Sequence, residues 1–304
     1  MGKTLMILLV GFTVSFGLLA ASKSRRFVSS VDRVVEQFTG YSAKNAATSG
    51  AYMALNRLYQ SNTWRTGYTN LVVAGDTVSV IVDDQTTDSS LADKRIRVRA
   101  TGRNKNTVEL SQALLFDGNF NQYAIWVKDT VANVQVRNAS DNPDSSYLMF
   151  KAPFMPNIDH NDLITAATAQ GKVHSVGTWI PSNDYPNGNF YAYGSTPNVT
   201  HVQGDMLVLE DRGVYGIFIV DGDVTIQGDG RVRGIIYMPN ASSTLLGSGG
   251  DAAEPAKVRG GVIVWGDIDG QNRPVRVRYE AAYMNSFKNN FAPNNPPLRV
   301  LSWQ

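Results

Sequence analysis

Aspartate residues crowd the C-terminal third of the chain, and two carboxylates held a few ångströms apart are the pair that hydrolyses glycosidic bonds. The residues are Asp221, Asp223, Asp229, Asp267 and Asp269. Each has a glycine beside it, and Asp-Gly is a standard turn pair, so turn formation explains them more simply than catalysis. No G-x-S-x-G, H-E-x-x-H, P-loop or G-x-G-x-x-G motif stands in a suitable context. We therefore predict that the chain is not an enzyme.

A second group of chemically capable residues is Asp159, His160 and Asp162, which lie within four positions of one another. His174 and His201 are the only other histidines, and there is no cysteine. No spacing among these residues matches a known metal-ligand pattern, so we interpret them as solvated loop residues. The sequence predicts no metal site and no cofactor.

Aromatic residues interleaved with Gly and Asn form a candidate contact surface in the polar segment 181–198, namely Tyr185, Phe190, Tyr191 and Tyr193. Such a cluster fits binding of a glycan or a protein surface. It fits equally well the packing of a long loop onto a core. Both interpretations stay open at this stage.

Composition narrows the possible partners. The 304 residues carry a net charge of +2, and the Lys and Arg residues are scattered without a basic tail or stripe along the sequence. Nucleic acid is therefore a poor partner candidate by sequence. The 27 glycines and the modest share of charged residues indicate short strands joined by many turns.

The segment Thr4–Ala21 contains eighteen residues without a charge. As a helix it would extend about 27 Å, just enough for the hydrocarbon core of a bilayer. We predict a membrane anchor and an exported remainder of the chain, on the periplasmic or extracellular side. The anchor residues are Thr4, Leu5, Ile7, Leu8, Phe12, Phe16 and Leu19.

Two other features bear on this anchor. Ala20, Ala21 and Ser22 would allow cleavage as a signal peptide, so retention and removal both stay open. Lys23, Arg25 and Arg26 follow the apolar stretch, and the positive-inside rule then disfavours an exported C-terminus. We still expect export, because long domains cross membranes largely regardless of flanking charge.

A helical period continues from Phe27 to Gln60, with a phase shift near Thr39 and Gly40 where the helix could bend. The first apolar stripe contains Phe27, Val31, Val34, Val35 and Phe38. The second contains Ala47, Ala51, Ala54, Leu55 and Leu58. Small residues in the second stripe would let the helix lie close to a sheet.

Segments 71–84, 94–102 and 106–116 alternate apolar and polar residues and predict three antiparallel strands covered by that helix. Ile96, Val98 and Ala100 should face inward. The ladder Arg95, Arg97 and Arg99 should face water.

Three similar phrases recur near the C-terminus, centred on Gly216, Gly234 and Gly261. Each combines an apolar strand with a Gly or Asp turn, and one such unit cannot bury its own face, so stacking is required. The sequence predicts a short β-solenoid, followed by a strand at 275–279, a helix at 280–288 and a terminal strand. The fold class is therefore α+β: a long helix on a small antiparallel sheet, then a mostly β region.

The plan of anchor, amphipathic helix and antiparallel sheet resembles type IV pilins and the pseudopilins of type II secretion. The start Gly2-Lys3-Thr4-Leu5-Met6-Ile7 resembles a prepilin cleavage site, with Gly2 before the cut and a leader of Met1-Gly2. The family usually has Phe where Lys3 stands and an acidic residue where Ile7 stands. The resemblance implies a minor subunit of a surface filament or secretion apparatus, with the membrane and other subunits as partners and a possible adhesive role.

The repeat segment also resembles bactofilins, which are cytoskeletal polymers. Two further functions therefore stay open: a secreted β-solenoid that binds or cleaves carbohydrate, and a bactofilin-like polymer. We expect four regions: the helix at 1–62, the sheet at 63–118, an irregular loop-rich insertion at 119–204, and the solenoid module with a capping helix at 205–304.

Overall fold

The computed structural model describes residues 2–175, 177–249 and 255–304, except the side chains of Thr4, Leu5, Ala192 and Tyr193. The chain forms two compact units. Unit 1 contains residues up to Asp117 together with Leu298–Gln304, and unit 2 contains Gly118–Pro297. Unit 2 is thus inserted between two segments of unit 1.

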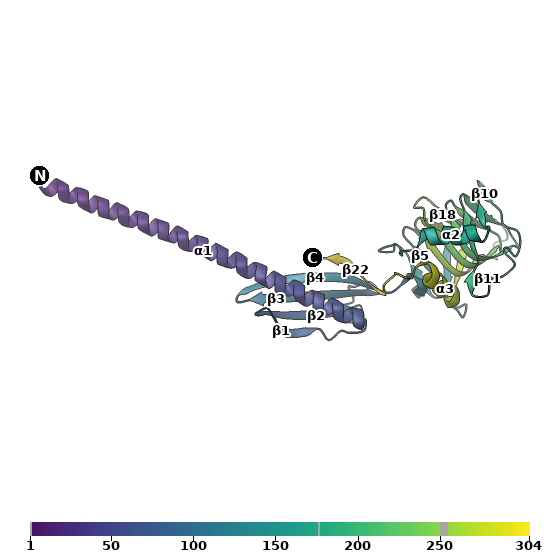
Figure 1. Cartoon of the computed structure of the whole chain (residues 1–304), viewed down its shortest axis with the longest axis horizontal. Coiled ribbons are helices and arrows are strands. Elements are labelled where there is room, and N and C mark those ends of the chain that lie inside the picture. The colour runs from purple at the N-terminus through teal and green to yellow at the C-terminus, as the bar shows by residue number, and fades with distance from the viewer. Residues whose placement is uncertain (1, 176, 250–254) are drawn as a thin grey trace. The chain divides into compact units, whose positions relative to one another are not determined.

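Unit 1 consists of one long helix and a five-stranded antiparallel sheet (Figure 1). Helix α1 spans Gly2–Gln60 without interruption. It therefore continues through Thr39 and Gly40, where the sequence suggested a bend. The sheet order is β1-β2-β3-β4-β22. The strands are β1 (Tyr68–Val73), β2 (Asp76–Asp84), β3 (Arg95–Asn104), β4 (Thr107–Asp117) and β22 (Leu298–Trp303).

The second apolar stripe of α1 packs on this sheet, as the sequence predicted. Its members Ala47, Ala51, Ala54, Leu55 and Leu58 are buried, as are Ile96, Val98 and Ala100 on β3. Glycine permits the close approach: a Cβ on Gly102 would lie 2.6 Å from the backbone nitrogen of Ala47. Contacts this short leave no room for a larger side chain.

Polar contacts also hold the middle of α1 to the sheet. The carboxylate of Asp76, which is 6% exposed, accepts hydrogen bonds from Ser42 Oγ at 2.5 Å and from Asn104 Nδ2 at 2.7 Å. Lys44 Nζ donates to the carbonyl of Leu110 at 2.6 Å. These contacts begin near Thr39, where burial of the helix also begins.

Unit 2 is a β-solenoid of two parallel sheets that enclose an apolar core. The larger sheet contains nine strands, with the main path β7-β21-β19-β17-β15-β13-β9. These strands are β7 (Val134–Arg137), β9 (Val173–His174), β13 (Val199–Val202), β15 (Gly213–Val220), β17 (Arg231–Met238), β19 (Ala256–Val264) and β21 (Val275–Tyr279). Two more strands, β5 (Ile125–Val127) and β8 (Leu148–Met149), branch from β19.

The smaller sheet has the order β10-β14-β16-β18-β20-β6. Its strands are β6 (Val131–Ala132), β10 (Thr178–Trp179), β14 (Asp205–Val208), β16 (Val224–Gln227), β18 (Thr244–Ser248) and β20 (Asp267–Asp269). A separate pair is formed by β11 (Tyr191–Tyr193) and β12 (Thr196–Pro197). The helical elements are α2 (His160–Ala169), α3 (Ala281–Phe291), η1 (Phe120–Gln122) and η2 (Ser145–Tyr147).

The three repeats stack in register through a ladder of glycines, in which Gly260 aligns with Gly234, one position before the Gly261 that the sequence predicted. Gly216 pairs with Gly234, and Gly234 with Gly260, all at positive φ of 124°, 155° and 142°. A Cβ on Gly234 or Gly260 would overlap the carbonyl oxygen of the preceding glycine in the ladder. Only glycine can therefore occupy this position in the inner repeats.

Helices α2 and α3 cover only one half of the larger sheet. Beyond the glycine ladder, the outward residues Ile217, Ile235 and Tyr237 are buried. Met284 of α3 fills the space above Gly261, and Phe287 contacts Tyr237 with ring centroids 6.3 Å apart. In the half of the sheet before the ladder, the outward residues on β17, β19 and β21 are exposed or half-buried with respect to the described residues.

Several expected boundaries differ from the structure. Segment 71–84 is a hairpin of two strands, because Ala74 and Gly75 form a turn with φ of 51° and 88°. Region 119–204, expected to be irregular, contributes strands β5 to β13 of unit 2. Many of these strands are only two to four residues long, too short to show a period. The terminal strand β22 pairs with β4 and belongs to unit 1 rather than to the solenoid module.

We predict that Gly102→Val loosens the helix from the sheet of unit 1. Forcing a branched side chain into a closed contact costs about 1–3 kcal/mol. Amide hydrogen exchange of residues 43–58 in the full chain should show a free energy of opening reduced by that amount. Gly40→Ala is the control, since a Cβ there meets nothing within 4 Å, and it should leave exchange unchanged or slower. Equal exchange in the Gly102→Val variant and the wild type would contradict the packing described.

Candidate functional surfaces

The predicted anchor residues lie on the surface of α1. The exposed fractions of Ile7, Leu8, Phe12, Phe16 and Leu19 range from 57% to 73%. An 18-residue window of this helix has mean hydropathy 1.8, and none of it is buried. The side chains of Thr4 and Leu5 lie outside the described part of the chain, and Gly2 and Lys3 are exposed at the start of α1. So large an apolar surface has no cover within the described residues.

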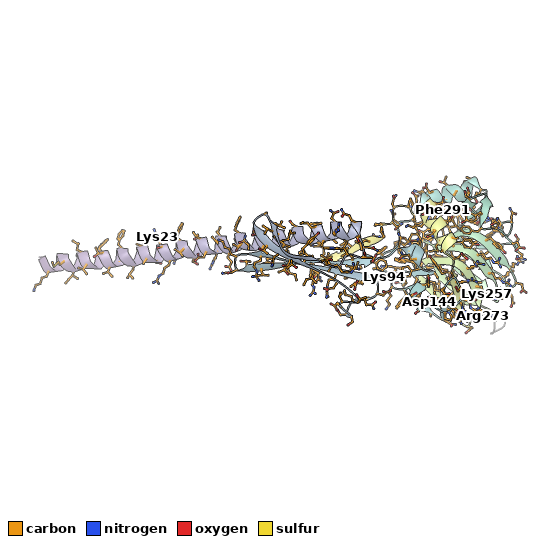
Figure 2. All side chains as sticks on the ribbon, turned by 90° about the horizontal axis from the view of Figure 1, so that it is seen from below. Lys23, Lys94, Asp144, Lys257, Arg273 and Phe291 are labelled. Carbon is orange, nitrogen blue, oxygen red and sulfur yellow. The ribbon has the colours of Figure 1, made fainter. Side chains whose placement is uncertain are left out.

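The first stripe of the amphipathic half is exposed as well. Phe27, Val31, Val34, Val35 and Phe38 are between 43% and 70% exposed. Lys23, labelled in Figure 2, stands between this stripe and the predicted anchor. The two apolar segments therefore lie on one continuous helix, separated by a short basic segment.

The predicted aromatic cluster divides between different packing contacts. The Tyr185 hydroxyl lies 3.2 Å from His174 Nε2, and its ring contacts Trp179 at 5.0 Å. Phe190 is 2% exposed and stacks on Tyr283 at 4.1 Å, while Tyr191 is half-buried against Phe190. The side chain of Tyr193 lies outside the described part of the chain. Tyr185 and Phe190 thus serve mainly to pack the loop on the solenoid.

Two of the three histidines come together, and neither is the solvated loop residue that the sequence suggested: His160 begins α2 and His201 is buried on β13. His201 Nε2 lies 2.9 Å from Asp221 Oδ2, and the His201 ring meets that of His160 with centroids 6.3 Å apart. Burial raises the pKa of neighbouring Tyr237 to about 12, so its phenol stays neutral. His201 is only 3% exposed, which withholds it from any ligand in solution. Among the described residues, no group of three or more His, Asp or Glu is arranged to hold a metal ion.

The turn aspartates bind backbone amides of neighbouring rungs. Asp223 Oδ1 accepts from Thr244 N at 2.7 Å, and Asp267 Oδ1 accepts from Thr130 N at 2.9 Å. Asp229 Oδ1 accepts from Asp211 N at 2.9 Å, and the guanidinium of Arg231 beside it lowers the pKa of that carboxyl below its ordinary value. Asp269 instead accepts from Gln271 N at 2.8 Å, within its own turn. These carboxylates are occupied in holding the turns.

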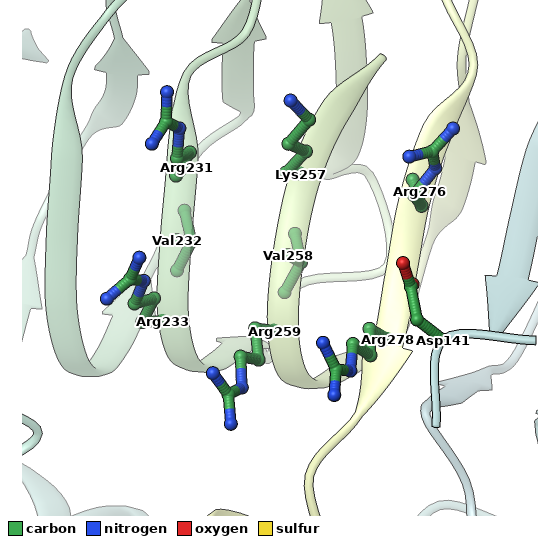
Figure 3. A pocket seen from close by; sticks show the side chains of 9 residues that line it. All are labelled: Asp141, Arg231, Val232, Arg233, Lys257, Val258, Arg259, Arg276 and Arg278. Carbon is green, nitrogen blue, oxygen red and sulfur yellow. The ribbon is translucent and has the colours of Figure 1, made fainter. Parts of the chain in front are cut away.

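The half of the larger sheet before the glycine ladder carries a surface that we call the basic face. It consists of two in-register rows on β17, β19 and β21: Arg231, Lys257 and Arg276 in one row, and Arg233, Arg259 and Arg278 in the other (Figure 3). The six side chains line a shallow concavity of about 450 Å³ together with Asp141, and Asp229 and Glu280 form ion pairs with Arg231 and Arg259. The side chains of Val232 and Val258, which stand between the two rows, are buried in the core on the other side of the sheet.

The basic face forms only in the folded chain. Its residues are scattered over 48 positions of sequence, from 231 to 278, and become a stripe only because the rungs stack in register. The alternation R-V-R, K-V-R and R-V-R at the repeats is the sequence signal that could have revealed it. Unit 2 as a whole contains 13 Lys and Arg against 17 Asp and Glu, so the face is a local concentration of charge.

The other arginine ladder, on β3 of unit 1, is neutralised by acidic neighbours. Arg99 forms an ion pair with Asp83 at 2.7 Å, Arg97 pairs with Asp88, and Arg95 lies over the ring of Phe116 at 4.8 Å. The expectation that this ladder simply faces water is therefore only partly met. Its charges are paired within the unit.

Comparisons with known proteins do not assign the chain to a family. No protein-family model matches the chain. No curated protein matches it either. Among solved structures, the chain is similar to the competence-associated pilin ComZ from Thermus thermophilus, with 11% sequence identity and a TM-score of 0.29. That match covers 88% of this chain and 97% of ComZ.

We predict that Asp221 stabilises unit 2 through His201. Asp221→Ala should leave the buried imidazole without its partner and lower the free energy of opening of β13 by about 1–3 kcal/mol. Amide hydrogen exchange of residues 199–202 measures this. Asp221→Asn keeps an acceptor and should cost less, and Asp162→Asn at an exposed position of α2 should cost little. Unchanged exchange in the alanine variant would show that the pair is not stabilising.

Proposed function

We propose that the chain is a pilin-like, membrane-anchored structural subunit of a surface filament or secretion apparatus, exposed outside the cytoplasm. The observation that carries this proposal is α1. One uninterrupted helix has an apolar first half that no described residue covers, and a second half that packs on an antiparallel sheet. Before assembly, a bilayer covers the apolar side chains of the first half. After assembly, the same half of neighbouring subunits covers them.

The exposed stripe from Phe27 to Phe38 supports assembly as well as anchoring. It follows the basic segment Lys23 to Arg26, where a helix leaves the hydrocarbon region, so a bilayer alone would not cover it. Apolar side chains exposed over three turns of helix are costly in water, and a partner helix of similar pattern would bury them. We therefore infer that the stripe contacts other subunits.

The placement of unit 2 is consistent with a subunit that presents an additional module. Asp117 at the end of β4 pairs with Leu298 at the start of β22, so the chain leaves and re-enters the sheet at adjacent points. Insertion between two paired strands leaves the sheet of unit 1 complete. A module of 180 residues can therefore be carried without disturbing the packing of α1.

Two alternative functions receive less support. Cleavage of carbohydrate would need free paired carboxylates, and the turn aspartates are bound to backbone amides. A bactofilin-like polymer would need open solenoid ends. The edge of β7 is instead covered by the chain itself, because Pro143 bridges Arg137 and Asp144 N donates to the carbonyl of Val136. A proline at an edge blocks the addition of another strand.

The absence of native cysteine makes the proposal directly testable. With Phe27→Cys or Val31→Cys in the membrane-bound full chain, we expect oxidation to yield covalent adducts with another copy or with another subunit. Asn289→Cys, exposed on α3, is the matched control and should yield none at equal expression. N-terminal sequencing of the membrane fraction should find the apolar segment retained.

The proposal fails if the mature chain is soluble and begins at Ser22, because a cleaved signal peptide leaves no anchor. It also fails if cross-linking from Phe27 and Val31 is no greater than from Asn289. Retention in the membrane without cross-links would reduce the function to that of an anchored monomer.

A further inference from the structure

Three exposed cations, Lys23, Arg25 and Arg26, stand on α1 directly after the uncharged segment Thr4–Ala21. On a helix, a side chain interacts with those three and four positions away. For these three residues all such positions fall within 19–30, which contains no Asp or Glu, and the first acidic residue of the helix is Asp32. The helix therefore offers the three cations no ion pair of its own.

The sheet of unit 1 cannot supply a partner either. Burial of α1 begins at Thr39. From Arg26 to Thr39 the helix rises about 20 Å, much more than the length of an arginine side chain. Because α1 is uninterrupted, the segment cannot fold back on the strands, and Figure 1 shows it beyond the sheet of its own unit. No described element of unit 1 comes close enough to neutralise these charges.

With Thr4–Ala21 in the hydrocarbon core, the three cations lie at the depth of the lipid headgroups. They follow the end of the core by about 3–8 Å, at the rise of an α-helix. The polar layer on each side of a bilayer is about 5–8 Å thick. Long basic side chains at such a position keep their methylene groups on apolar surface and place their charge among the lipid phosphates.

The arrangement of the cations around the helix favours lipid over a protein partner. Successive residues of a helix differ by about 100°, so Lys23, Arg25 and Arg26 point in directions of about 0°, 200° and 300°. They form a ring and not a stripe. A partner helix contacts one face, as it would along the stripe from Phe27 to Phe38. Lipids surround an anchor on all sides, and a ring of cations suits that geometry.

We propose that Lys23, Arg25 and Arg26 bind the headgroups of anionic phospholipids at the exported face of the membrane and thereby hold the anchor at a fixed depth. The inference rests on the proposed membrane anchoring. A Lys or Arg near an anionic surface favours an anionic lipid by about five-fold. Guanidinium groups also form paired hydrogen bonds with phosphate oxygens. This contact gives a role to cations that the positive-inside rule would place on the other side.

The test measures lipid preference and membrane retention separately. The full chain carries a fluorescent donor on Ser29→Cys, its single cysteine, at an exposed position beyond Arg26. It is reconstituted into phosphatidylcholine vesicles with phosphatidylglycerol in both leaflets, so that its orientation does not affect the result. Energy transfer to phosphatidylglycerol labelled on its acyl chain is compared with transfer to phosphatidylcholine labelled in the same way.

We expect the relative association with phosphatidylglycerol to be about five-fold that with phosphatidylcholine. It should decline as salt rises from about 0.1 to 1 M, because screening shortens the range of the attraction. The decisive variant combines Lys23→Gln, Arg25→Gln and Arg26→Gln. It should lower the ratio to about one and leave the chain resistant to extraction by alkaline carbonate.

The matched control removes three exposed cations of the same unit that lie away from the membrane segment: Arg57→Gln, Arg103→Gln and Lys105→Gln. It changes the net charge equally and should keep the preference. Arg25→Lys with Arg26→Lys preserves the charge and should keep most of it. Should the triple variant not insert, Arg25→Gln alone replaces it, with about a third of the excess transfer lost.

Equal transfer to the two lipids in the wild type overturns the proposal, as does an unchanged preference in the triple variant, or in its single replacement, or an equal loss in the control. Oxidation of Ser24→Cys in the native membrane tests for a protein partner. Adducts as abundant as those from Val31→Cys would assign the ring to protein and overturn the proposal as well. Release of the wild-type chain by carbonate contradicts the anchoring itself, whereas retention without a lipid preference contradicts only the headgroup contact.

Discussion

The in-register stacking of parallel rungs is the constraint on which unit 2 depends. Each rung places the same kind of residue at the same height, so one sequence phrase is converted into continuous ladders. Glycines at positive φ allow neighbouring backbones to meet, valines fill the core, and aspartates at the turns bind amides of the next rung. A shift of register by one residue would send the apolar residues outward and the cations inward.

In unit 1, the corresponding constraint is the close packing of helix α1 on the antiparallel sheet. Small residues along α1 and Gly102 on β3 bring helix and sheet backbones together, and Asp76 joins the helix to the β3–β4 hairpin. Because this packing begins only near Thr39, everything before it on α1 is left for other partners. The same helix therefore packs on the sheet of its own unit after Thr39 and is exposed before it, and this transition from exposed to buried takes about one helical turn.

The glycine ladder also divides the larger sheet of unit 2 into two surfaces of different chemistry. After the ladder, the outward side chains are apolar and are buried by α2 and α3. Before it, on β17, β19 and β21, they are basic and are exposed or half-buried with respect to the described residues. The proposed anchoring surface and the basic face thus arise in separate units by different means: an apolar helix that no described residue covers, and a repeated R-V-R or K-V-R phrase stacked into rows.

The sequence by itself determined the elements whose signal is local. The eighteen uncharged residues, the small-residue stripe from Ala47 to Leu58, the inward residues of β3 and the repeated glycines all predict their structure through composition or period. The tertiary structure alone decided what depends on distant pairing. Strand β22 pairs with β4 although 180 residues of chain lie between them. Short strands of region 119–204 pair with strands of the solenoid. His201 contacts Asp221 and His160. The tertiary structure also brought six cations from separate segments into two rows. The sequence could not show this, because side chains from different strands become neighbours only through the register of the sheet.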